Sequence, residues 1–225
     1  FYMINKVTDS LAQAFSGIQD GSVVMIGGFG GSGIPHELIE GLVAQNAKDL
    51  VIITNNAGSG ETGIAALLKS RRVRKIICSY PRMANSHIFE TLYRSKEIEL
   101  ELTPQGNLAE RIRAQGAGIG GFFTETAFGT LLAQGKETRL INGKNYVFES
   151  PLEADFALIK GFKGDRWGNL VYRKASRNFG PIMAMAAKTT IAQVQEVVEL
   201  GVLDPEQIIT PGIFVQHVIH VGEPI

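Results

Sequence analysis

Residues 20–35 read DGSVVMIGGFGGSGIP, which predicts a strand, a glycine-rich turn and the start of a helix, in that order. The run at 22–26 is typical of a strand that is buried on both faces of a parallel sheet. The glycine run that follows allows a tight turn or a close approach of the backbone to a ligand. Pro35 suits the first turn of a helix. The inner face of that helix would carry Leu38, Ile39, Leu42 and Val43.

The same unit of strand, loop and helix repeats through the first two-thirds of the chain. We expect strands at 50–54, 75–79 and 98–102, and helices at 62–70, 85–94 and 107–114. This alternation predicts an α/β fold: an open, largely parallel sheet with helices on both faces. Ligands of such sheets bind beyond the carboxyl ends of the strands. Three loops that follow strands, at 27–33, 55–58 and 104–106, should therefore face one edge.

After Gly116 the pattern loosens. Short strands are expected around 146–149, 156–159 and 191–198, with a helix from about 7 to 18 at the other end of the chain and a short one at 183–187. Gly135, Asn142-Gly143 and Gly168-Asn169 favour hairpins. No linker-like composition interrupts the chain, so residues 1–225 are interpreted as a single domain. Met3 is expected to be the natural first residue, preceded by two added residues, Phe1 and Tyr2.

The composition excludes several classes of protein. Lysine and arginine total 22 and aspartate and glutamate total 22, so net charge does not hold this chain to nucleic acid or to an anionic membrane. With 44% hydrophobic residues the chain can build a core. One cysteine forms no internal disulfide, and no run approaches the ~20 apolar residues of a membrane span. We expect a cytoplasmic protein.

Residues 28–33 fit the G-x-G-x-x-G pattern of dinucleotide-binding proteins. That function needs an acidic residue about 20 positions further on, at the end of the second strand. Thr54, Asn55 and Asn56 stand there instead, and Asp49 precedes the strand. A tight turn without a ligand and a binding loop for another ligand both remain open.

The longer segment 20–35 resembles the first signature of the family I coenzyme A transferases. That signature is an acid or Asn, then Gly, three apolar residues, Gly-Gly-Phe, and Gly-x-Pro four residues later. The resemblance covers essentially the whole chain from Met3 and is to the A subunit of these enzymes. It continues through TNNAG (54–58), TPQGNLAE (103–110), GAGIG (116–120), GTLLAQGKE (129–137), GDRWGNL (164–170) and ASRNF (175–179).

The resemblance implies a mechanism and a partner. In the family, a glutamate carboxylate attacks the acyl-CoA thioester and is converted to a glutamyl-CoA thioester, a form of nucleophilic catalysis. This glutamate lies in the B subunit, within a Ser-Glu-Asn-Gly motif that this chain lacks. The chain is therefore expected to hold no catalytic nucleophile, no metal and no cofactor, and to form an AB or A2B2 complex with a B subunit. Its substrates would be succinyl-CoA and a 3-oxo acid, with 3-oxoadipate favoured over acetoacetate.

The resemblance also suggests which residues bind the substrate. The glycine run would bring backbone amides to the CoA or its acyl group, through Gly27, Gly28, Phe29, Gly30, Gly31, Ser32 and Gly33. Asn55, Asn56 and Gln105 match the family's residues near the acyl group, and their amides can donate hydrogen bonds without adding charge. An asparagine after a strand is also an ordinary turn former.

Other interpretations stay open. A sugar-phosphate isomerase of related fold would need an acid/base pair in these loops, and Glu61 is the only acid near them. A non-catalytic CoA-binding or regulatory subunit would lack the nucleophile too. A solvated face is favoured over a contact with CoA phosphates or with the partner subunit for the cluster of Arg173, Lys174 and Arg177. Cys78 is expected to be a buried packing residue.

Overall fold

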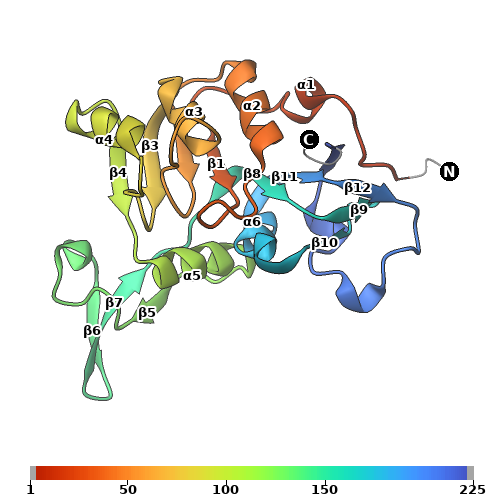
Figure 1. The fold of residues 1–225 in the computed structure, drawn as a ribbon. Coiled ribbons are helices and arrows are strands. Elements are labelled where there is room, and N and C mark those ends of the chain that lie inside the picture. The colour runs from red at the N-terminus through yellow and green to blue at the C-terminus, as the bar shows by residue number, and fades with distance from the viewer. Residues whose placement is uncertain (1–3, 222–225) are drawn as a thin grey trace.

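A seven-stranded sheet runs through the computed structural model, which describes residues 4–221 (Figure 1). Its strand order is β13-β11-β8-β1-β2-β3-β4, and every neighbouring pair is parallel. The predicted parallel α/β sheet is thus confirmed. The strands are β1 (Val23–Ile26), β2 (Leu50–Ile53), β3 (Val73–Cys78), β4 (Glu99–Leu102), β8 (Ala154–Lys160), β11 (Ala187–Val194) and β13 (His217–His220).

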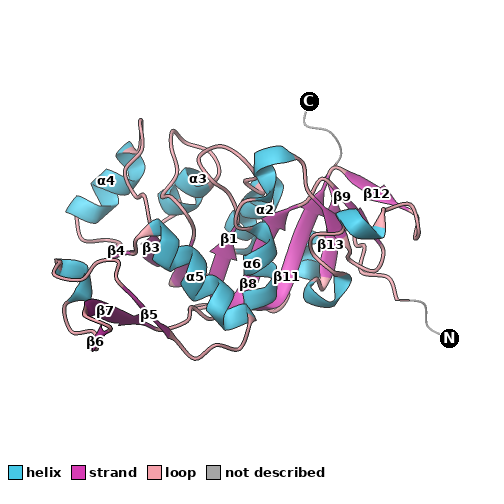
Figure 2. Cartoon of the chain, turned by 90° about the horizontal axis from the view of Figure 1, so that it is seen from below, coloured by secondary structure: helices cyan, strands magenta, loops and turns pink. Residues whose placement is uncertain are grey.

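Helices cover both faces of the sheet, as Figures 1 and 2 show. Val24 and Ile26 of β1 belong to the core on one face, while Met25 between them belongs to the core on the other, because side chains alternate along a strand. The first core contains residues of α1 (Leu11–Ala14), α2 (His36–Gln45), α3 (Ile64–Lys69) and α4 (His87–Arg94). The second contains residues of α5 (Gln105–Gly116) and α6 (Gly180–Ala186).

Two small sheets flank the main one. The antiparallel sheet β5-β7-β6 projects below β4 in Figure 1, and the sheet β10-β9-β12 lies near the opposite end. Asn142 and Gly143, both with positive φ, form the predicted hairpin turn between β6 and β7. Gly168 lies in the turn between the antiparallel β9 and β10. The strands are β5 (Phe122–Thr124), β6 (Thr138–Ile141), β7 (Lys144–Glu149), β9 (Lys163–Asp165), β10 (Leu170–Val171) and β12 (Glu196–Val198).

Several boundaries differ from the prediction. Helix α1 has a single turn, because Val7 pairs with Val218 at the edge of the sheet instead of continuing a helix. Helix α5 begins at Gln105, directly after Pro104, so Gln105 is helical and does not lie in a loop. The expected strand at 191–198 is divided between β11 and β12. Short 3-10 helices are Leu131–Ala133, Lys174–Arg177, Pro205–Gln207 and Gly212–Phe214.

The expected start at Met3 lies outside the described residues. Within residues 4–221, no helix has both the length and the apolar character that crossing a membrane requires.

Candidate active site

The loops that follow four neighbouring strands enclose one hollow of about 370 Å³. These loops leave the carboxyl ends of β1, β2 and β3, and the fourth leads from β4 into helix α5. The hollow thus confirms the prediction that the three expected loops face one edge of the sheet. Its lining consists of Phe29, Gly30, Asn55, Asn56, Ser79, Tyr80, Met83 and Gln105.

Asn55 and Gln105 form a hydrogen-bonded pair in the lining of the hollow. Asn55 is only 3% exposed, and its Oδ1 accepts from Gln105 Nε2 at 2.8 Å and from Ser79 Oγ at 2.9 Å. A carboxamide nitrogen carries two hydrogens, so Gln105 keeps one for a ligand. Among residues 4–221, no hydrogen bond uses Asn55 Nδ2. Both side chains line the hollow, so their amide nitrogens retain hydrogens that can be donated to a ligand there.

Asn56 has a local role that the sequence left open. Its Oδ1 accepts from the backbone amide of Gly58 at 3.0 Å, which closes a short turn. Its backbone also pairs with Tyr80, so it connects the loops that follow β2 and β3. Asn56 lines the hollow and shapes the loop at the same time.

The hollow is lined by amides, two hydroxyls, apolar groups and aromatic rings, and none of the lining residues is an acid, a lysine, an arginine or a histidine. Glu61, the acid considered from the sequence, lies outside the lining, is exposed and pairs with Lys69 at 3.1 Å. Cys78 is buried as predicted, and this burial raises the pKa of its thiol to about 12. Glu61 is therefore not placed to contact a ligand in the hollow, and burial favours the protonated form of the Cys78 thiol.

The glycine run makes a tight turn whose members have different surroundings. Phe29 and Ser32 exchange two backbone hydrogen bonds of 2.9 Å, and Phe29 is half exposed at the rim of the hollow. Gly30 lines the hollow, and a Cβ at Gly30 or Gly31 would meet nothing within 4 Å. Gly27 donates to the backbone of β8. Of the seven residues that were predicted to bind, the structure places Phe29 and Gly30 in the lining.

Two glycines of the run are required by packing. A Cβ on Gly28, where φ is +132°, would lie 2.8 Å from Ile34, and one on Gly33, where φ is +73°, would lie 2.6 Å from the carbonyl oxygen of Ser176. Asn178 holds this turn from outside: it accepts from the Gly28 amide at 3.1 Å and donates to the Ser32 carbonyl at 3.1 Å. Local patterns in the sequence gave no sign of this role for Asn178, because the contact spans about 150 positions.

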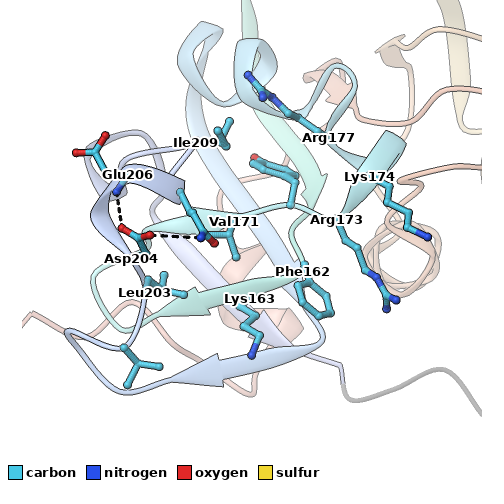
Figure 3. A pocket seen from close by; sticks show the side chains of 13 residues that line it. Phe162, Lys163, Val171, Arg173, Lys174, Arg177, Leu203, Asp204, Glu206 and Ile209 are labelled. Atoms are coloured by element: carbon cyan, nitrogen blue, oxygen red, sulfur yellow. Dashed lines mark hydrogen bonds between the residues drawn. The ribbon is translucent and has the colours of Figure 1, made fainter.

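A second hollow, of about 730 Å³, is lined in part by Arg173, Lys174 and Arg177 (Figure 3). The Arg173 guanidinium lies 5.5 Å from the centre of the Phe162 ring, and Lys163 pairs with Glu196 at 2.7 Å. Figure 3 shows Arg173 and Arg177 pointing in different directions. This spread is typical of a solvated face and does not resemble a site for a single phosphate.

The described residues contain no group of three or more His, Cys, Asp or Glu side chains placed to hold a metal ion. His217 and His220 lie on β13, where His220 is exposed. The chemistry that the first hollow offers is hydrogen bonding to an oxygen that is or becomes negative, in a small uncharged pocket.

A family model and several known proteins are similar to this chain over nearly its whole length. The family model described as Coenzyme A transferase matches residues 8–220. The A subunit of 3-oxoadipate CoA-transferase from Pseudomonas putida is 67% identical over 98% of this chain and 95% of its own length. Its counterpart in Acinetobacter baylyi is 62% identical over 97% and 96%. The A subunit of a succinyl-CoA:3-ketoacid coenzyme A transferase from Helicobacter pylori is 48% identical over 98% and 94%.

Solved structures share the fold. An acyl-CoA transferase of Escherichia coli O157:H7 superposes with a TM-score of 0.82 at 22% identity, over 96% of this chain and 47% of that chain. The glutaconate coenzyme A-transferase of Acidaminococcus fermentans also gives 0.82, at 20% identity, over 96% and 76%.

Proposed function

Because the chain belongs to the coenzyme A transferase family, we propose that it is the A subunit of a two-subunit enzyme that moves CoA from succinyl-CoA to 3-oxoadipate. The names of its relatives support the acceptor. Two relatives that are 67% and 62% identical are both 3-oxoadipate enzymes, whereas 3-ketoacid enzymes from Helicobacter pylori and Bacillus subtilis are 48% identical.

The observation that carries this proposal is a substrate-sized hollow lined by amide donors without a carboxylate. Its volume of about 370 Å³ lies near the small end of ligand pockets, so it suits an acyl group and not an entire CoA molecule. The glutamate that the family's chemistry requires must then come from the partner subunit.

CoA transfer proceeds through covalent intermediates on the partner's glutamate. The partner's glutamate carboxylate attacks the thioester carbonyl of succinyl-CoA, the CoA thiolate leaves, and a mixed anhydride remains. The thiolate then attacks the glutamyl carbonyl, which releases succinate and leaves CoA on the glutamate as a thioester. The carboxylate of the 3-oxo acid repeats these steps in reverse and departs as its own CoA ester.

The amides of Asn55 and Gln105 can be used in two ways in this sequence of steps. They can donate to the acyl oxygen as it gains negative charge, or they can hold the distal carboxylate of the substrate. Loss of a hydrogen bond to the acyl oxygen would lower kcat, and loss of a hydrogen bond to the distal carboxylate would raise KM. The cytoplasmic location, the AB or A2B2 stoichiometry and the absence of metal and cofactor stay predictions.

The proposal is tested by assembling the chain with its partner and comparing acceptors. We expect transfer from succinyl-CoA to 3-oxoadipate with a kcat/KM at least about 10-fold above that for acetoacetate, a difference of ~1.4 kcal/mol. An equal or higher value for acetoacetate would assign the chain to the 3-ketoacid enzymes. No transfer with any 3-oxo acid would favour a non-catalytic CoA-binding subunit.

A further inference from the structure

Helix α5 begins with Gln105 and carries two buried polar residues in the turns that follow. Asn107 is 3% exposed and Arg111 is 8% exposed. The carboxylate of Glu149, at the end of β7, is 1% exposed and lies against both of them. A buried charge of this kind needs closely placed partners, because leaving it unpaired is costly.

Arg111 reaches the segment that leads into Gln105. Its Nη1 donates to Glu101 Oε1 at 3.0 Å and to Thr103 Oγ1 at 3.5 Å. Its Nε donates to the Ser150 carbonyl at 2.7 Å and lies 3.7 Å from Glu149 Oε2. Thr103 precedes Gln105 by two positions. Arg111 therefore connects the entrance of the helix to the segment that follows β7.

Glu149 holds the residue on the other side of Gln105. Its Oε1 accepts from Asn107 Nδ2 at 3.1 Å and from Lys136 Nζ at 2.7 Å. Asn107 follows Gln105 by two positions, so the backbone is tied on both sides of the glutamine. None of these residues lines the hollow.

We propose that Arg111 and Glu149 are positioning residues that set the place of the Gln105 carboxamide at the hollow. The proposal rests on the proposed function, in which Gln105 binds the acyl group. Networks of buried hydrogen bonds restrict the conformations of their members, and a catalytic geometry tolerates only small displacements. Gln105 is joined to Asn55 at 2.8 Å, so a shift of α5 would lengthen this bond and move the Gln105 donor relative to the substrate.

The matched variants are Arg111→Met and Arg113→Met. Arg113 lies on the same helix, is 45% exposed and pairs with Glu110 at 2.6 Å. In the assembled enzyme we expect Arg111→Met to lower kcat/KM about 10-fold, below the 100-fold that a 1 Å misplacement can cause. Arg113→Met should stay within about 2-fold of wild type.

A double-variant cycle separates positioning from a general loss of stability. If Arg111 acts through Gln105, Arg111→Met should lower kcat/KM less than 2-fold in an enzyme that already carries Gln105→Ala. Losses that multiply in the double variant would overturn the proposal, as would wild-type activity in Arg111→Met. Should Arg111→Met fail to assemble, Arg111→Lys keeps the positive charge beside Glu149 and is put through the same cycle with the same criteria.

These outcomes are distinct from a failure of the proposed function. If the wild-type complex transfers CoA and the losses multiply, only the positioning role is wrong. If the wild-type complex transfers no CoA, the proposed function itself is wrong.

Discussion

Gln105→Ala should lower kcat/KM of the assembled transferase at least about 10-fold, and by roughly 100- to 1000-fold if the amide serves the developing oxyanion. The second hydrogen of Gln105 Nε2 is the donor that this variant removes, while Asn55 keeps its bond from Ser79. Steady-state kinetics with both substrates checks the expectation. A fall in kcat would indicate the oxyanion role, and a rise in KM alone would indicate a role in holding the carboxylate.

The matched control is Gln115→Ala, which makes the same change on helix α5 away from the hollow. It should leave kcat/KM within about 2-fold of wild type. If Gln105→Ala assembles with its partner and matches that control, Gln105 does not belong to the site.

Gly33→Ala should destabilise the chain by about 3 kcal/mol, because it combines two penalties. A residue with a side chain in the left-handed region costs roughly 1–2 kcal/mol, and the added Cβ would lie 2.6 Å from the Ser176 carbonyl oxygen. For a chain of this size the expected drop in Tm is roughly 6–12 °C, measured by thermal unfolding followed by circular dichroism.

Gly31→Ala is the control within the same turn. Its φ lies outside the left-handed region, and its Cβ would meet nothing within 4 Å. The expected change in stability is below about 0.5 kcal/mol. Equal destabilisation by the two variants would show that the turn as a whole, and not the packing at Gly33, limits stability.

The first half of the fold could be predicted because its information is local. The apolar runs of β1, β2 and β3 are each followed by a loop and a helix, and parallel strands place the loops that follow them at one edge. This direction brings the segments that carry Asn55 and Gln105 to the same edge, and the strand order β2-β3-β4 sets how near they lie. The start of α5 was missed by two residues, because Pro104 permits a helix that begins directly after it.

The second half depends on contacts between distant positions. Strands β8 and β11 read as short isolated runs, yet β8 pairs with β1 at the centre of the sheet. The hydrogen bonds of Asn178 to the glycine turn and of Glu149 to Asn107 likewise leave no signal in local periodicity. For the same reason the sequence could not distinguish Gly33, which packs against Ser176, from Gly31, which is open.

In the proposed complex this chain supplies the acyl pocket while the partner supplies the nucleophile. The most direct test incubates the assembled enzyme with succinyl-CoA alone and measures the intact mass of each subunit. We expect one CoA adduct, with the loss of one water, on the partner, and an unchanged mass for this chain. An adduct on this chain, or CoA transfer by this chain without its partner, would show that this chain carries the nucleophile itself.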